Sequence, residues 1–196
     1  MTTALTTASL GQLRRQGVRR LRAEWALVTP EEQAVGVTWY DEAHVWVVRL
    51  AFKHGITTPE VAGIAATLSP RLPWHRAIAM TEAMLDGHDI RGQGLRKQVD
   101  KAQAILDGGD PYKLVSGVKV TSFFHNLMGE YSWVTIDKWA FDQVSGRDYN
   151  TGDHHMLERR GVYETYADCF RVVAFEQGLE PAVAQAVLWI STRGKA

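Results

Sequence analysis

Apolar side chains recur at helical spacing along most of the chain. Between residues 39 and 55, one helical face collects the apolar residues Trp39, Ala43, Trp46, Val47 and Leu50. The same spacing, interrupted by glycines, predicts further helices at 59–68, 73–86, 94–107, 119–128, 137–145, 159–177 and 181–192. No two segments alternate as paired strands would, and the β-branched run 134–136 is too short to start a sheet. The pattern predicts an all-α protein.

Two helix starts are marked by residues that cap helices. Thr29 precedes Pro30 and is followed three residues later by Glu32, which predicts an N-cap, a proline in the first turn and a capping box. Thr58, Pro59 and Glu60 nearly repeat this opening.

Charge is balanced over the whole chain but unevenly distributed along it. Lysine plus arginine and aspartate plus glutamate number 22 each, so net charge gives no argument for nucleic acid. Residues 10–25 nevertheless contain five arginines and one glutamate, and residues 91–119 are also rich in basic side chains. Each stretch is either a surface that faces phosphates or an ordinary solvated helix face.

The remaining composition bounds the class of protein. A chain of 196 residues suits one compact domain or one split into two lobes. Its single cysteine, Cys169, excludes an internal disulfide, a cysteine-ligated iron–sulfur cluster and a thiolate zinc site. No apolar run reaches transmembrane length and the first residues lack a secretory apolar run, so we expect a cytoplasmic protein without a membrane partner.

A lysine and an aspartate stand at two predicted helix starts. In GVKVTSFFHNLMGEYSWVTIDKW, Gly117 precedes Lys119 at the head of one helix, and Asp137 follows an apolar run at the head of another. Gly117 can adopt positive φ, and the free N–H groups after it suit a phosphate, although an ordinary corner between two helices has the same pattern. Asp137 is an N-cap, a carboxylate kept ionised by the helix dipole for chemistry, or both.

The region 111–145 resembles the helix-hairpin-helix DNA glycosylases, the superfamily of endonuclease III-like and 8-oxoguanine-excising enzymes. Members have a leucine, a glycine-bearing hairpin, a lysine in the bifunctional enzymes and an essential aspartate after a short apolar run. This chain has Leu114, Gly117, Lys119 and Asp137 in that order. It departs from the pattern at Val115, where the hairpin usually has a first glycine.

The resemblance implies a two-lobed helical fold with the active-site cleft between the lobes. Residues 1–196 then form one glycosylase-like unit, in which 1–55 and 146–196 make one lobe and 56–145 make the lobe with the hairpin and the catalytic pair. The enzyme would extrude a base from double-stranded DNA and cleave its N-glycosidic bond, with Asp137 stabilising the positive sugar. Lys119 would add lyase activity through a Schiff base. We expect a monomer that needs no cofactor.

Further site residues follow from the same resemblance. The stiff turn at 68–74 supplies Ser69, Arg71 and Trp74 to the base pocket. His125 and Trp139 are weaker candidates for the pocket, and at position 139 the family commonly has a histidine. The DNA backbone would meet the hairpin residues Tyr112, Lys113, Ser116, Gly117 and Val118. Adjacent His154 and His155 lack partners at ligand spacing, so we expect no metal site.

The sequence does not decide which base is the substrate or which reaction takes place. We expect a damaged or modified base, and favour a bulky or hypermodified one of the kind found in phage DNA, which would place the enzyme in repair or in defence against phage. One alternative is an enzyme that modifies such a base on the same scaffold and leaves the sugar linkage intact. Another is a non-catalytic helical module that binds DNA, in which Asp137 only caps its helix.

Overall fold

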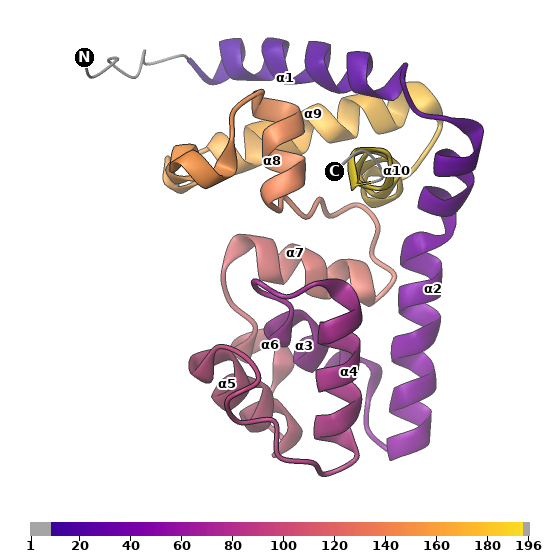
Figure 1. Ribbon diagram of the computed structural model, residues 1–196, viewed down its shortest axis with the longest axis vertical. Helices are drawn as coiled ribbons and strands as arrows, with labels where there is room; N and C mark the ends of the chain where they lie inside the picture. The colour runs from indigo at the N-terminus through magenta and orange to yellow at the C-terminus, as the bar shows by residue number, and fades with distance from the viewer. Residues whose placement is uncertain (1–8, 194–196) are drawn as a thin grey trace. The chain divides into compact units, whose positions relative to one another are not determined.

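The computed structural model describes residues 9–193, which are helical over most of their length (Figure 1). The α-helices are α1 (Leu10–Trp25), α2 (Pro30–His54), α3 (Thr58–Leu68), α4 (Trp74–Leu85), α5 (Arg96–Leu106), α6 (Pro111–Leu114), α7 (Val118–Leu127), α8 (Lys138–Ser145), α9 (Val162–Gln177) and α10 (Pro181–Arg193). Two short 3-10 helices, η1 (Tyr149–Thr151) and η2 (Asp153–Glu158), lie between α8 and α9. No strand occurs within residues 9–193, so the predicted all-α class is confirmed.

The two helix starts predicted from capping residues have side-chain caps, and at one of them the cap lies one residue before the predicted position. Thr29 accepts a hydrogen bond from the Glu32 N–H, and the Glu32 carboxylate accepts one from the Thr29 N–H, as predicted. At α3 the capping residue is Thr57 rather than Thr58, because its hydroxyl accepts from the Glu60 N–H and Glu60 reaches back to it. Pro59 therefore lies at the second helical position.

The described chain divides into two compact units, of which the first, unit 1, is formed by residues up to Thr38 and from Val134 onward. In unit 1, α1 packs along α9 and against α8, and α10 contacts α8 and α9 (Figure 1). Its core is one apolar cluster that includes Leu21, Phe141, Phe170 and Leu188. The extended segment before α8 also enters this cluster through Val134 and Ile136.

The second unit, unit 2, spans Trp39–Trp133 and is arranged around α3. Helices α4, α5, α6 and α7 all contact α3, which is buried from Val61 to Leu68. Small side chains allow this crowding: a Cβ on Gly63 would lie 2.9 Å from the Pro111 Cβ at the start of α6. The close approach of α3 to α6 fixes the base of the hairpin between α6 and α7.

The borders of these units differ from the predicted lobe boundaries. They fall at Thr38 and Trp133, inside α2 and just before the extended segment, instead of at residues 55 and 145. The border at Trp133 precedes the predicted one because Val134 and Ile136 are buried in the same apolar cluster as residues of α1 and α9. Lys119 therefore belongs to unit 2, and Asp137 belongs to unit 1 together with both ends of the described chain.

Candidate functional site

Asp137 occupies the N-cap of α8, and two donors hold its carboxylate. One oxygen accepts a hydrogen bond of 2.8 Å from the Ala140 N–H, and the other accepts one of 3.1 Å from the indole N–H of Trp189 in α10. The residue is half-buried. The first bond is what an N-cap requires, whereas capping does not require the second. Both bonds and the helix N-terminus favour the ionised carboxylate.

The backbone that leads to Asp137 is itself held in place by Tyr163 of α9. The Tyr163 hydroxyl donates to the Val134 carbonyl and accepts from the Ile136 N–H, each at 3.0 Å. This bridge satisfies two backbone groups of a segment that has no sheet partner. The extended run and the carboxylate after it are thus fixed by side chains from α9 and α10.

A second contact joins α8 to α10 behind the carboxylate. The Gln143 amide donates 2.8 Å to the Leu188 carbonyl, next to Trp189, and also bonds the Thr192 hydroxyl. The Arg193 guanidinium lies 4.5 Å from the centre of the Trp189 ring. Contacts at Leu188, Thr192 and Arg193 therefore hold the part of α10 that contains the Trp189 indole.

A second carboxylate on α8 has a different environment. Asp142 accepts a 2.7 Å hydrogen bond from the Tyr149 N–H at the start of η1. Burial raises the pKa of Asp142, although the Tyr149 bond works in the opposite direction. Asp142 ties the segment after α8 to the helix, and it provides a matched control for Asp137.

The hairpin between α6 and α7 has the predicted glycine turn. Gly117 adopts φ 89° and ψ 128° and supplies no side chain to cap α7, and a Cβ there would meet open space. Val118 and Ser116 on either side are exposed. The Ser116 hydroxyl accepts from the Lys101 ammonium of α5 at 2.6 Å, so a cation lies beside the turn. Uncapped N–H groups with a cation beside them suit a phosphate.

Two other predicted DNA contacts lie on α6. Tyr112 is exposed and packs edge-on against Phe124, with ring centres 5.1 Å apart. Lys113 is exposed and its ammonium lies 3.2 Å from the Asp110 carboxylate, which caps α6. Because this ion pair is on the surface, it leaves Lys113 able to exchange its partner for a phosphate.

Lys119 is the second residue of α7 and is half-buried. It lies one residue after the start of the helix, in unit 2, whereas Asp137 lies in unit 1. The convergence of these two side chains on one substrate stays a prediction.

In the turn predicted to line the base pocket, two of the three candidate side chains already make contacts within unit 2. The Ser69 hydroxyl donates 2.9 Å to the Ala66 carbonyl, which leaves only its lone pairs for a ligand. Arg71 is exposed and is the only described non-glycine residue with positive φ, at 65°. Trp74 packs against Trp46 and Phe123, with ring centres 5.4 Å away in each case. Of the three, Arg71 is the one most available to a ligand.

The two weaker pocket candidates have local partners. The His125 ring stacks on Trp133 at 4.2 Å and bonds the Glu130 carboxylate at 3.0 Å. Trp139 is half-buried, and the Lys138 ammonium lies 4.4 Å from the centre of its ring. His125 belongs to unit 2 and Trp139 to unit 1.

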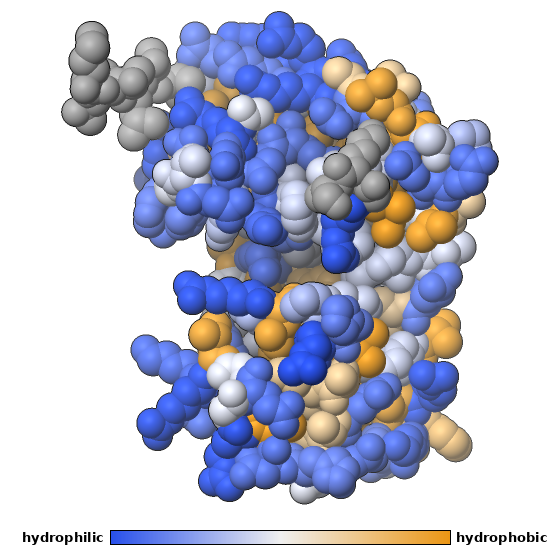
Figure 2. Space-filling view, viewed as in Figure 1, coloured by the Kyte–Doolittle hydropathy of each residue, from blue (hydrophilic) through white to orange (hydrophobic). Residues whose placement is uncertain are grey.

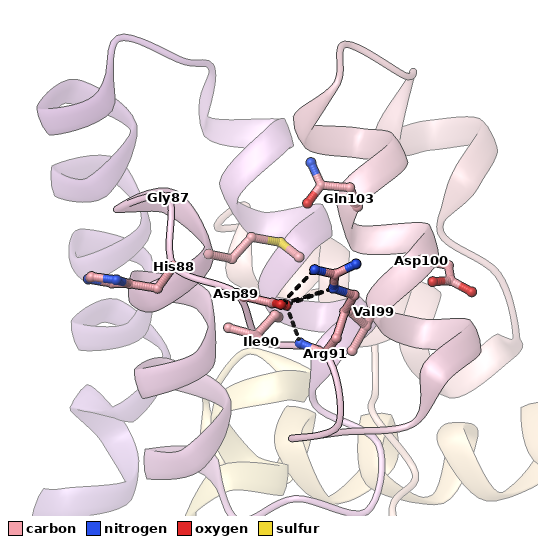
Figure 3. Close-up of a pocket in the computed structure, with 9 residues that line it drawn as sticks. Gly87, His88, Asp89, Ile90, Arg91, Val99, Asp100 and Gln103 are labelled. Carbon is pink, nitrogen blue, oxygen red and sulfur yellow. Dashed lines mark hydrogen bonds and ion pairs between the residues drawn. The ribbon is translucent and has the colours of Figure 1, made fainter.

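A pocket in unit 2 is lined by none of the predicted site residues (Figure 3). It has a volume of about 320 Å³ and is lined by Met84, Gly87, His88, Asp89, Ile90, Arg91, Val99, Asp100 and Gln103. Asp89 and Arg91 bond each other across it at 2.7 Å, and Arg91 holds the pKa of Asp89 at about 2. Asp89 and Arg91 therefore neutralise each other in the lining of this pocket.

Two features, a cluster of metal ligands and a membrane-spanning helix, are not found among the described residues. No group of three or more histidine, cysteine, aspartate or glutamate side chains gathers in a way that would hold a metal ion within residues 9–193. Over the same residues, no helix has the length and apolarity needed to cross a bilayer.

Trp189 is the functional candidate that sequence reasoning missed. It lies 52 positions after Asp137, inside an apolar run that reads as core. The one available signal is that an indole N–H needs an acceptor when it is buried, and Asp137 is an ionisable residue predicted at a helix start.

Comparison with known proteins gives a family and nothing closer. The sequence model of one family, described as a family of unknown function, matches residues 3–196. Neither the curated proteins nor the solved structures contain a match.

Proposed function

The chain belongs to the family of unknown function DUF7178, and we propose that it is a DNA glycosylase that extrudes a modified base and cleaves its N-glycosidic bond. The observation that carries the proposal is the carboxylate of Asp137. It is half-buried, accepts hydrogen bonds from the Ala140 N–H and the Trp189 indole N–H, and follows a segment held by Tyr163. A mere N-cap does not call for a second donor from another helix.

The hairpin adds independent support for a DNA substrate. Gly117 leaves the first turn of α7 uncapped and open, and Lys101 lies next to the turn through its bond to Ser116. Such a turn binds a backbone phosphate without reading a base. A sequence-independent grip suits an enzyme that identifies its substrate by the extruded base.

The chemistry follows from a charge that develops on the sugar. As the base departs with the electron pair of the N-glycosidic bond, C1′ becomes positive, and an ionised Asp137 stabilises it. Water then adds its oxygen to C1′ and gives a proton to Asp137, while the base takes a proton from solvent. In the bifunctional version, the Lys119 amine bonds C1′ instead, forms a Schiff base and allows β-elimination of the 3′ phosphate.

The proposal is tested with duplexes that carry oxidised, alkylated and bulky hypermodified bases, scored for free base by mass spectrometry. A glycosylase releases a base and leaves an abasic site. An enzyme that exchanges a substituent on the base changes the mass of the nucleoside and leaves the sugar linkage whole. A non-catalytic module binds the duplexes and changes none of them, and that result would overturn the proposal.

Lys119 is expected to determine whether strand cleavage accompanies base release. Borohydride should trap the wild-type protein on substrate DNA, and Lys119→Gln should abolish the trapped complex because the only proposed amine is lost. Lys113→Gln is the matched control, since it removes an exposed lysine from the same hairpin. If wild-type protein releases base but forms no trapped complex, water is the nucleophile and Lys119 has no covalent role.

Trp189 is expected to position Asp137. Trp189→Phe removes one N–H and keeps most of the ring, and loss of a hydrogen bond to a charged group should slow base release about 10- to 100-fold with DNA affinity unchanged. Trp25→Phe, which alters another indole packed against the unit 1 core, should leave the rate unchanged. In the wild type, the indole N–H resonance of Trp189 should move as Asp137 titrates; a resonance that ignores Asp137→Asn would refute the contact in solution.

A further inference from the structure

The outer face of α1 in unit 1 has a cluster of arginines that the proposed site around Asp137 does not include. Arg15, Arg19 and Arg22 recur at helical spacing opposite the buried face that contains Leu13 and Leu21, and all three arginines are exposed. Arg14 is exposed on the flank of the same helix. Figure 2 shows the surface along α1 as predominantly hydrophilic.

The turn before α9 adds two more arginines beside the start of α1. A Cβ on Gly161 would lie 3.0 Å from the Leu10 side chain, so this turn abuts the first residue of α1. Arg159 and Arg160, which immediately precede Gly161, are both exposed. We define the arginine surface as Arg14, Arg15, Arg19, Arg159 and Arg160.

The nearby carboxylates do not neutralise this surface. Helix α9 packs against α1, and three of its acids already bond other arginines: Glu164 and Asp168 hold Arg171, and Glu176 holds Arg22. Among the described residues, no ion pair is found for any arginine of the arginine surface.

Repulsion between unpaired arginines destabilises α1, and a bound polyanion would offset that repulsion. Arg15 and Arg19 are one helical turn apart, and like charges at that spacing destabilise a helix. The helix is nevertheless well formed, with a complete capping box at Ser9 and Gln12. Arginine is the residue best suited to phosphate oxygens, because its guanidinium donates in a planar fork.

We propose that the arginine surface is a second binding site for the DNA backbone, separate in the chain from the hairpin. The identification of DNA rests on the proposed function, whereas the phosphate chemistry rests on the arginines alone. The surface gives unit 1 a contact with the duplex backbone that does not depend on the hairpin, which belongs to unit 2. An anionic lipid surface is the alternative partner.

The test compares Arg15→Gln/Arg19→Gln with Arg49→Gln/Arg91→Gln, which removes two exposed arginines from unit 2. Both variants lose the same charge. Binding to an unmodified 20-base-pair duplex is measured by fluorescence anisotropy between 50 and 300 mM KCl. The α1 variant should bind about 10-fold more weakly at low salt and lower the slope of log affinity against log salt by about 2, one phosphate for each arginine. The unit 2 variant should keep the wild-type slope.

The outcomes separate this inference from the proposed function. An altered slope without base release by the wild type would support the arginine surface and overturn the glycosylase. Base release by the wild type together with an unaltered slope for the α1 variant would support the glycosylase and overturn the arginine surface. Vesicles of phosphatidylserine and phosphatidylcholine test the lipid alternative, and an effect of the α1 variant on vesicles but not on DNA would overturn the proposal. Unchanged melting of the variant would show that the fold is intact.

Discussion

Asp137→Asn should reduce the rate of base release by about 1,000-fold or more, because a neutral amide does not stabilise a positive C1′ as a carboxylate does. DNA affinity should stay within a few-fold of wild type, since the hairpin in unit 2 is untouched. The fold should also survive. Asparagine is as good an N-cap as aspartate and can accept the same hydrogen bond from the Ala140 N–H, but its single oxygen cannot also accept from the Trp189 indole, so we expect a loss of up to about 1 kcal/mol in the free energy of unfolding.

The measurement is single-turnover release of base from the best substrate of the panel, with thermal melting of each variant beside it. Asp142→Asn is the matched control, because Asp142 lies on the same helix and bonds the Tyr149 backbone instead of Trp189. It should keep the wild-type rate.

Asp137→Ala separates the two roles of the carboxylate. Loss of the cap should cost about 1 kcal/mol of stability, and in a glycosylase it should abolish activity as well. An Asp137→Ala protein that is less stable but releases base at the wild-type rate would reduce Asp137 to a structural cap.

Most of the fold could be predicted because its signals are local. The seven helix ranges predicted from residue 59 onward match the observed helices to within three residues, and the largest error among them is at α9, which begins at Val162 instead of residue 159. The apolar spacing gave no range for α1 or for the one-turn helix α6. Thr57 and Thr58 are adjacent and chemically equivalent, so the sequence could not decide which one caps α3. The stretch 145–153 is polar and contains two glycines, which predicts a surface loop, but it includes η1 and the first residue of η2.

The candidate site was predictable only in its local part. Asp137 as a capping residue follows from the apolar run before it, and the turn at Gly117 follows from the glycine. Trp189 and Tyr163 could not be found this way, since their bonds to Asp137 and to its extended segment join positions 52 and 27 to 29 residues apart. Such contacts depend on how α8, α9 and α10 pack, and no periodicity reports that.

The contact between Trp189 and Asp137 depends on how α10 packs in unit 1, and a substitution at Gly36 tests that packing. In unit 1, Gly36 of α2 touches the Val187 backbone: a Cβ at position 36 would lie 2.8 Å from the Val187 nitrogen and closer still to its Cα. A main chain inside a packed helix cannot swing away as a flexible side chain can. Gly36→Ala should therefore lower the free energy of unfolding of unit 1 by about 3 kcal/mol, despite the higher helix propensity of alanine.

The single cysteine reports this loss directly. Cys169 is fully buried in the unit 1 core, and burial raises the pKa of its thiol to about 11, so the native protein should react very slowly with a thiol reagent at pH 8. A loss of about 3 kcal/mol raises the open population, and hence the labelling rate, by about 100-fold. Gly11→Ala is the matched control, because the nearest atom to its Cβ is 3.6 Å away in an exposed side chain. Equal labelling of Gly36→Ala and Gly11→Ala would mean that α10 does not pack against α2 at Val187, and the placement of Trp189 beside Asp137 would lose its support.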